Sequence, residues 1–168
     1  MTLEEAKEQF VQTWGTLGTN WGINRTMAQI HALLMISPQP LSTEEIMEQL
    51  KISRGNTNMN TRELIAWGLV HKELKPGERK EYFVAEKDIW EVAQCIIRER
   101  KRRELDPIRK AIENLSHIDG NKKTPEHQAF LEVVQEIQGI SSTADKVLSK
   151  FSSIEKNWFI KKFMKLFA

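Results

Sequence analysis

The stretch from residue 24 to residue 84 constrains the fold of this 168-residue chain most, because short periodic segments alternate there with strong stop signals. Apolar residues at helical spacing predict a helix over about 24–37, and Pro38 ends it, since proline cannot continue a helix. Ser42 or Thr43 then caps a second, short helix whose first turn is acidic, as the positive end of a helix dipole favours. Two successive helices are therefore expected in the first half of this stretch.

A third helix and a hairpin complete the stretch. Ser53 caps a helix that runs to about Trp67, and Gly68 stops it. Two β-prone runs then flank residues 75–79, where a Pro-Gly pair predicts a hairpin turn. Three helices followed by a hairpin, within about 60 residues, is the order of a winged helix-turn-helix.

Helical periodicity also precedes this stretch. Capped by a threonine, a helix is expected over residues 3–17. The glycines that follow its middle, Gly15, Gly18 and Gly22, are expected to loosen the chain around Trp21.

The C-terminal half reads as helical from residue 87 onward, with a kink or a restart at Asp106-Pro107. An apolar stripe over residues 130–154 is too long for a winged module to cover, so it predicts a dimerisation seam. The expected fold class is mainly α with a small β-hairpin, a winged helix-turn-helix plus long dimerisation helices. Its expected parts are an N-terminal helix contributing to the dimer (1–23), the winged helix-turn-helix domain (24–86) and a helical dimerisation region (87–168).

Composition excludes several classes of protein. With 25 Lys+Arg against 23 Asp+Glu, the net charge of +2 argues against a protein that coats nucleic acid. The one cysteine, Cys95, excludes a disulfide framework and a multi-cysteine zinc site within one chain. The four histidines lack metal-ligand spacing, and neither a phosphate loop nor a nucleophile motif occurs, so we expect no enzyme and no cofactor. Without an export signal or a run of ~20 apolar residues, the expected location is cytoplasmic, away from the membrane.

The helix expected over residues 53–67 has two unlike faces. Its inner face, with Thr57, Thr61 and Leu64, is turned towards the preceding helix. The other face is polar and carries Arg54, Gly55, Asn56, Asn58, Met59 and Arg62, with Asn60 counted among its asparagines. Asparagine and arginine pair bidentately with adenine and guanine edges, and methionine can touch a thymine methyl group. A merely solvated face is the alternative, but the position as third helix of a winged helix favours reading of nucleic acid.

The expected hairpin is basic. Residues 54–80 hold six cations and three acids, so the local surplus of +3 exceeds the net charge of the whole chain. Lys75, Arg79 and Lys80 would lie on phosphates beside the groove, adding affinity without sequence information. An ordinary charged turn is the alternative for the hairpin taken alone.

Four motifs in this region resemble the winged-helix signature of MarR-type bacterial regulators. They are Leu41-Ser42-Thr43-Glu44-Glu45-Ile46, Leu50-Lys51-Ile52-Ser53-Arg54-Gly55-Asn56, Arg62-Glu63-Leu64 and Trp67-Gly68-Leu69-Val70. The closest likeness is to the GbsR-like subgroup, through Ser53-Arg54-Gly55-Asn56, Met59-Asn60 and, upstream, Trp14-Gly15 and Trp21-Gly22-Ile23-Asn24-Arg25-Thr26. The likeness covers about residues 5–100 well and the C-terminal third poorly.

The resemblance implies a homodimeric, double-stranded-DNA-binding regulator of transcription, usually a repressor, acting on a pseudo-palindromic operator. It places the 53–67 helix in the major groove, with DNA-facing positions at Ser53, Arg54, Asn56, Asn58, Met59 and Arg62. The sequence departs from the family at Thr57 and Thr61, where relatives often carry aliphatic residues; both can still pack through a methyl group. The rival hypothesis is a winged helix used as a protein-interaction scaffold without DNA binding.

Three further features leave alternatives open. Trp14, Trp21 and Trp90 could form an aromatic cage for a quaternary-ammonium effector, as some relatives sense choline-like compounds, although tryptophan is more often core. The basic run 98–103 is interpreted as a solvated bridge, with phosphate contact as the alternative. The basic and aromatic end, residues 151–168, is interpreted as a dimer helix, with a membrane-surface helix as the alternative.

Overall fold

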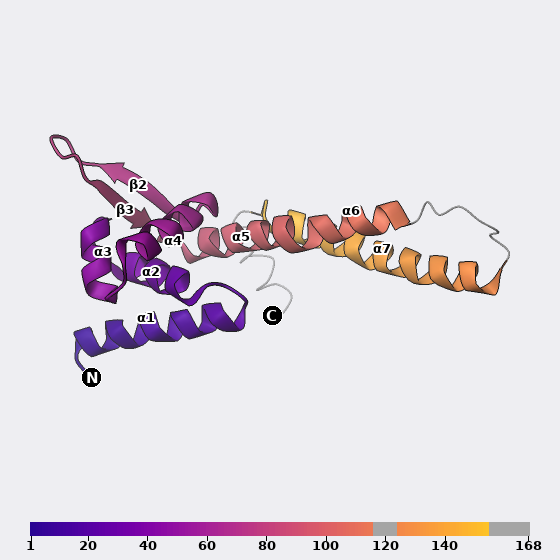
Figure 1. The fold of residues 1–168 in the computed structure, drawn as a ribbon, viewed down its shortest axis with the longest axis horizontal. Coiled ribbons are helices and arrows are strands. Elements are labelled where there is room, and N and C mark those ends of the chain that lie inside the picture. The colour runs from indigo at the N-terminus through magenta and orange to yellow at the C-terminus, as the bar shows by residue number, and fades with distance from the viewer. Residues whose placement is uncertain (116–123, 155–168) are drawn as a thin grey trace, which may run out of the picture. The chain divides into compact units, whose positions relative to one another are not determined.

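The computed structural model describes residues 1–115 and 124–154 and divides into two compact units, Met1–Val92 and Ala93–Ala168. It is mostly helical with one small antiparallel sheet, which confirms the expected fold class (Figure 1). The membrane-surface or dimer-helix interpretation of the chain end falls mostly on residues 155–168, outside the described residues. In the described part, no helix is long and apolar enough to cross a membrane.

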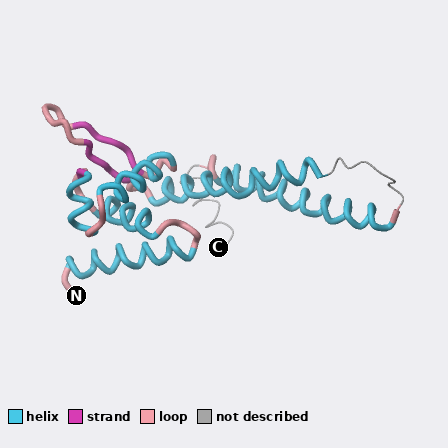
Figure 2. Tube along the Cα trace, in the orientation of Figure 1, coloured by secondary structure: helices cyan, strands magenta, loops and turns pink. Residues whose placement is uncertain are grey.

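The first unit contains a winged helix-turn-helix preceded by one long helix (Figure 2). Its elements are α1 (Leu3–Asn20), α2 (Arg25–Ile36), β1 (Leu41–Ser42), α3 (Thr43–Leu50), α4 (Arg54–Ala66), β2 (Val70–Leu74) and β3 (Glu81–Ala85). The sheet order is β1-β3-β2, and both pairings are antiparallel. Strand β1 is a finding of the structure, because the sequence predicted only the two-stranded hairpin. It joins the start of α3 to the wing, with Leu41 opposite Phe83.

Two glycines of α1 are helical and serve close packing, so the expectation that they loosen the chain was wrong. A Cβ on Gly15 would lie 2.7 Å from Cγ of Gln29, and one on Gly18 would lie 2.6 Å from Cβ of Ala28. Because neither glycine has a side chain, α1 can approach α2 closely at both positions. The helix accordingly extends to Asn20, three residues beyond the predicted end.

Short-range caps fix where the helices begin. Thr2 and Glu5 form a reciprocal capping box at the start of α1, and Ser42 and Glu45 form another at the start of α3. These signals act within one turn of the chain, and for that reason they were visible in the sequence.

The end of α2 is capped from a distant part of the chain. The Lys87 ammonium donates to the carbonyl oxygens of Leu34 at 2.7 Å, Met35 at 2.8 Å and Ser37 at 2.7 Å. A cation there complements the negative end of the helix dipole, while partial burial lowers the pKa of Lys87. The sequence predicted a helix from Lys87 onward. In the structure Lys87 lies before the helix, because α5 (Ile89–Arg100) begins two residues later.

The core of the first unit is aliphatic and lies between the helices and the inner side of the sheet. Its most deeply buried side chains are Ile30, Leu34, Ile46, Leu64, Val70, Thr57 and Thr61. Two of these are threonines of α4, so the position of that helix depends on how well their hydroxyl groups are satisfied.

The second unit holds the rest of α5, a π-helical turn η1 (Lys101–Leu105), α6 (Asp106–Leu115) and α7 (Pro125–Phe151). The sequence anticipated a kink or restart at Asp106-Pro107, and the chain passes through η1 immediately before it. Proline lacks the N–H of a regular helical hydrogen bond, and a π-helical turn is one way for a helix to accommodate that loss. Thr124 caps α7, its hydroxyl accepting from the backbone N–H of His127 at 3.3 Å.

Candidate nucleic-acid interface

The turn between α3 and α4 sets the direction of the third helix of the winged module. Lys51 ends α3 in the left-handed conformation (φ 53°), which reverses the chain within a few residues. Ser53 then caps α4, its hydroxyl accepting from the backbone N–H of Asn56 at 3.3 Å. Arg54 donates to Glu44 of α3 at 2.7 Å, and this hydrogen bond is the main cause of the lowered pKa of Glu44. A predicted DNA-facing residue, Arg54, is thus held against the preceding helix.

The inner face of α4 is as predicted. Thr57, Thr61 and Leu64 are all buried. The Thr57 hydroxyl donates to the carbonyl of Ser53 at 3.1 Å, and the Thr61 hydroxyl donates to that of Thr57 at 2.8 Å. Each threonine satisfies its polar atom on its own helix and leaves its methyl group for the core. That arrangement explains how threonines can occupy buried positions of α4.

The outer face of α4 is open to solvent. Met59 is 60% exposed, Arg62 is exposed, and Asn58 is half-buried. Within the described residues, Arg62 forms no ion pair and the Asn58 amide forms no hydrogen bond. A donor–acceptor amide and a guanidinium therefore remain available on one side of this helix.

Asn60 does not belong to that outer face, which corrects the expectation from the sequence. It is buried, and its Nδ2 donates to both the backbone carbonyl (2.8 Å) and Oδ1 (2.7 Å) of Asn56. Residues four apart share one side of a helix, so Asn56 lies at the edge of the buried side and is half-buried. The Asn56 side chain keeps its Nδ2 donors and one lone pair of Oδ1 for another partner.

The end of the wing next to its turn is tied together by side chains of both strands and of the turn itself. Lys75 lies 3.9 Å from the centre of the Tyr82 ring, and the Tyr82 hydroxyl donates to the Glu78 carboxylate. That hydrogen bond is the main cause of the rise of the Tyr82 pKa to about 12. Lys72 pairs with Glu81 across the strands at 2.6 Å. Lys75, a predicted phosphate contact, is thus engaged with an aromatic ring of its own hairpin.

The tip of the wing carries the remaining predicted contacts. Gly77 adopts a positive φ of 81°, which permits the tight turn between β2 and β3. Arg79 and Lys80 follow it, both exposed, and neither forms an ion pair within the described residues. In Figure 1 the hairpin extends beyond the helices of the first unit. Both cations belong to its turn, between the end of β2 at Leu74 and the start of β3 at Glu81.

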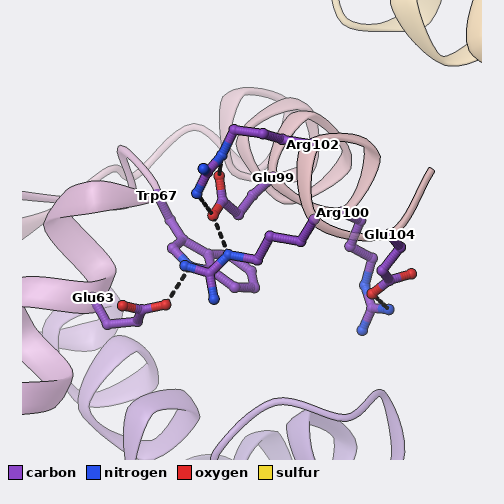
Figure 3. Close-up of polar contacts among 7 residues, drawn as sticks. Glu63, Trp67, Glu99, Arg100, Arg102 and Glu104 are labelled. Carbon is purple, nitrogen blue, oxygen red and sulfur yellow. Dashed lines mark hydrogen bonds and ion pairs between the residues drawn. The ribbon is translucent and has the colours of Figure 1, made fainter. Parts of the chain in front are cut away.

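At the other end of α4 lies Trp67, the predicted helix end and the first residue of the motif Trp67-Gly68-Leu69-Val70. Its indole Nε1 donates to the carboxylate of Glu63 at 3.1 Å (Figure 3). The bond joins residues four apart at the last turn of α4, and Gly68 follows in the left-handed conformation (φ 75°). Together they fix the end of α4 and the entry into the wing.

The basic run 98–103 of the second unit is largely neutralised within its own unit. Buried Glu99 pairs with Arg102 at 2.5 Å and with Arg103, and Arg100 pairs with Glu104 at 2.8 Å (Figure 3). The hydrogen bond from Arg102 is the largest cause that lowers the pKa of Glu99. These pairs favour the interpretation of the run as a solvated bridge over one that contacts phosphates.

The three tryptophans of the predicted effector cage lie at separate positions along the chain. Trp14 stacks on Phe10 within α1, with ring centres 5.6 Å apart, and lies 6.3 Å from the ring of buried His31. Trp21 is at the end of α1 and is 53% exposed, and Trp90 is at the start of α5. The contacts of Trp14 are those of a core residue, and an effector site at these tryptophans stays a prediction.

Comparison with known proteins agrees with this geometry. Residues 21–81 match the family model described as MarR family. A crystal structure described as a transcriptional regulator is similar over 89% of this chain and 99% of its own, with a TM-score of 0.55 and 19% identity. None of the curated proteins matches the chain.

Two further crystal structures are less similar. One is Sco3205, a MarR family transcriptional regulator from Streptomyces coelicolor in complex with DNA (TM-score 0.41, 21% identity, 82% of this chain and 90% of that one). The other is the adhesin competence repressor AdcR from Streptococcus pyogenes (TM-score 0.37, 18% identity, 88% of this chain and 99% of that one). Over residues 21–81, the chain therefore carries a winged helix-turn-helix that matches the MarR family.

Proposed function

We propose that the protein is a sequence-specific, double-stranded-DNA-binding regulator that represses transcription as a homodimer on a pseudo-palindromic operator. The observation that carries the proposal is the exposed outer face of α4 beside a wing whose tip carries the exposed cations Arg79 and Lys80. We further propose that it is a cytoplasmic bacterial protein of the GbsR-like subgroup, on the sequence resemblance described above.

In this proposal α4 enters the major groove. Arg62 can pair bidentately with a guanine, and Asn58 can pair with an adenine through its amide. Met59, a large apolar side chain that α4 exposes, can contact a thymine methyl group. Asn56 contributes the donors that remain after its bond with Asn60. Base reading is thereby concentrated on Asn58, Met59 and Arg62.

The wing supplies affinity instead of specificity. Arg79 and Lys80 would contact phosphates of the adjacent backbone, where each neutralised phosphate releases counterions. Lys75 would act from its position over the Tyr82 ring. Since two copies related by a two-fold axis read two half-sites, the half-sites should lie about one helical turn, or ~34 Å, apart.

The test begins with selection of bound fragments from the source genome, which identifies the operator. Arg62→Ala should reduce the preference for operator over random duplex by about 1–3 kcal/mol. Arg79→Ala should weaken binding to both duplexes alike and lower the slope of log affinity against log salt by about 1. Lys110→Ala, which removes an exposed cation from α6, is the matched control and should change neither quantity.

Two results would contradict the proposal. If Arg62→Ala and Arg79→Ala both bound operator and random duplex like the parent, the assignment of α4 and the wing would be wrong. If the parent showed no steep loss of DNA affinity with added salt, the chain would be a scaffold, because electrostatic binding to DNA is necessarily salt-dependent.

A further inference from the structure

Asn60 is a buried amide in the middle of α4. Only 3% of its surface is exposed, so the surrounding core holds its side chain in place. Burying an amide costs free energy unless its polar atoms are hydrogen-bonded. The nitrogen Nδ2 finds both of its acceptors on the same helix, at the backbone carbonyl of Asn56 (2.8 Å) and at Oδ1 of Asn56 (2.7 Å). Each of its two N–H groups thus has one acceptor.

The chemistry of these two bonds fixes the direction of both amides. A backbone carbonyl can only accept a hydrogen bond, so the Asn60 atom beside it is the nitrogen. The same nitrogen lies 2.7 Å from the amide of Asn56, so the Asn56 atom that faces it is the acceptor, Oδ1. Nδ2 of Asn56 is on the other branch of its planar amide and is therefore directed away from Asn60. It forms no hydrogen bond with any residue of the ranges 1–115 and 124–154.

Asn56 belongs to the first turn of α4, three positions after the cap at Ser53. The N-terminal residues of a recognition helix are those that contact base edges. The neighbouring Gly55 has no side chain, and a Cβ there would meet no atom within 4 Å. The first turn therefore presents the free amide nitrogen of Asn56 with open space beside it.

We propose that Asn60 is a positioning residue, which holds the amide of Asn56 so that α4 presents a hydrogen-bond donor to the major groove. A donor pairs with O6 and N7 of guanine or with O4 of thymine, whereas cytosine and adenine place an amino group where these keto oxygens lie. Asn56 thereby selects a keto base, guanine or thymine, at one position of each half-site. The proposal rests on the proposed function, in which α4 enters the major groove.

Asn58 provides the comparison within the same helix. It is also half-buried, but its amide forms no hydrogen bond within the described residues, so it can turn either atom towards a base. A free asparagine pairs with adenine through both atoms of its amide. Two asparagines of one helix therefore differ in the base they prefer, because only Asn56 is held.

The free protein tests the direction of the amides before any DNA is added. By NMR of ¹⁵N-labelled protein, the side-chain NH₂ protons of Asn60 should exchange with water at least about tenfold more slowly than those of Asn56, because only the former are bonded and buried. Faster exchange at Asn60 than at Asn56 would overturn the proposed positioning.

The base contact is tested on the selected operator, with each base pair replaced in turn. Asn56→Ala identifies the contacted position, where the preference for one base should fall at least about fivefold. Asn56→Asp keeps an acceptor for Asn60 and replaces the outward donor with an acceptor. The preference at that position should then reverse from guanine or thymine to cytosine, by about tenfold. Asn58→Asp is the matched control, because it adds the same charge to the same helix and should leave the preference at that position unchanged.

Asn60→Ser tests the positioning itself. The serine hydroxyl can donate to the same backbone carbonyl, as the hydroxyl of Thr61 does to that of Thr57 at 2.8 Å, so the helix stays satisfied. The amide of Asn56 is then free to turn, and its preference for a keto base over adenine should fall at least about threefold. Preferences at the other positions should stay, whereas a purely structural role of Asn60 would lower affinity for every operator variant alike. Circular dichroism and thermal unfolding check that the variant is folded.

Three results on DNA would overturn the proposed positioning. They are a parent that prefers adenine or cytosine at the Asn56 position, an Asn56→Ala variant that weakens operator and random duplex alike, as a phosphate contact would, and an Asn60→Ser variant with unchanged preferences. If Arg62→Ala still lowers the preference for operator in that case, the proposed function stands without the positioning. If the parent does not distinguish operator from random duplex, the proposed function and the base contact fall together, and the NMR exchange rates still decide how the Asn56 amide is held.

Discussion

The two compact units of this chain differ in how far their apolar side chains are buried. In the first unit aliphatic side chains from α2, α3, α4 and the sheet fill one shared core. In the second, Cys95 and Val134 are the buried apolar residues of the described part, and α6 and α7 expose several others. The contrast teaches that the winged module is complete as a folding unit, whereas the α6–α7 pair has a surface suited to a further partner.

The largest effect should come from a matched pair of isoleucines. Ile30 is fully buried in the first unit, and Ile140 is 72% exposed in the second. Ile30→Ala should lower the free energy of unfolding by roughly 2–5 kcal/mol, because it leaves a cavity in a packed core. Ile140→Ala should change it by less than about 0.5 kcal/mol at concentrations where the chain is monomeric. Urea denaturation followed by circular dichroism measures both, and equal losses would mean that the two units are not packed differently.

The response to acid should also differ between the units. Burial lowers the pKa of His31 from 6.5 to about 4, and its Nε2 has no hydrogen-bond partner within the described residues. As pH falls, His31 of the unfolded chain therefore binds a proton before His31 of the folded chain does. The free energy of unfolding is unaffected by His31 above pH 6.5 and decreases as pH falls towards 4. The total decrease amounts to roughly 3 kcal/mol.

The control for this prediction is His31→Leu, which keeps an apolar volume and removes the titration. Its stability should be nearly flat between pH 6.5 and 4.5, measured by urea denaturation at each pH. In the second unit the pKa of Glu99 is lowered, so its contribution should be lost only as pH falls below the ordinary value of 4.5. If the parent and His31→Leu lost stability equally between pH 6.5 and 4.5, His31 would not be buried neutral.

Removing a helix cap should cost less stability than these changes, and the cost should differ between the two units. Ser42 is buried, and it exchanges three hydrogen bonds with Glu45 at the start of α3. Thr124 is exposed at the start of α7, where its side chain accepts from the N–H of His127. Ser42→Ala should cost about 1–2 kcal/mol and Thr124→Ala about 0.5–1 kcal/mol. Hydrogen exchange resolved along the chain should locate the first loss in the first unit, and the reverse order of costs would contradict the cap geometry.

The smallest effects should be gains in stability when alanine replaces either of two glycines that have open space beside them. A Cβ on Gly55 of α4 or on Gly139 of α7 would meet no atom within 4 Å. Alanine at either position should stabilise the monomer by about 0.5–1 kcal/mol, because glycine loses more backbone entropy in a helix. Thermal unfolding measures the gain. Gly15→Ala is the opposite control and should destabilise, since its Cβ would collide with Gln29.

Local signals were predictable from the sequence because they act within one helical turn. The caps at Thr2, Ser42 and Ser53 all form the hydrogen bonds that their positions predicted. The order of helices and hairpin followed from these signals and from apolar periodicity. The two faces of α4 followed for the same reason, apart from one residue.

That residue is Asn60, whose burial could not be predicted from local sequence signals. Periodicity places it near the boundary between the two faces, and only its bonds to Asn56 decide that it is buried. Gly15 and Gly18 were misjudged because glycine suits both a loose turn and a close helix contact, and only the presence of α2 distinguishes these cases. No sequence signal would have marked Lys87 as the cap of a helix fifty residues earlier.

The sequence by itself determined the helices and the hairpin, their boundaries to within a few residues and the polar character of the outer face of α4, because each depends on neighbours in the chain. The tertiary structure decided the pairing of β1 with β3, the engagement of Arg54 and Lys75 within the first unit, and the exposure of the α7 stripe. These depend on which distant groups compete for the same hydrogen bonds and the same buried volume. Such competition is settled only when the whole chain has packed.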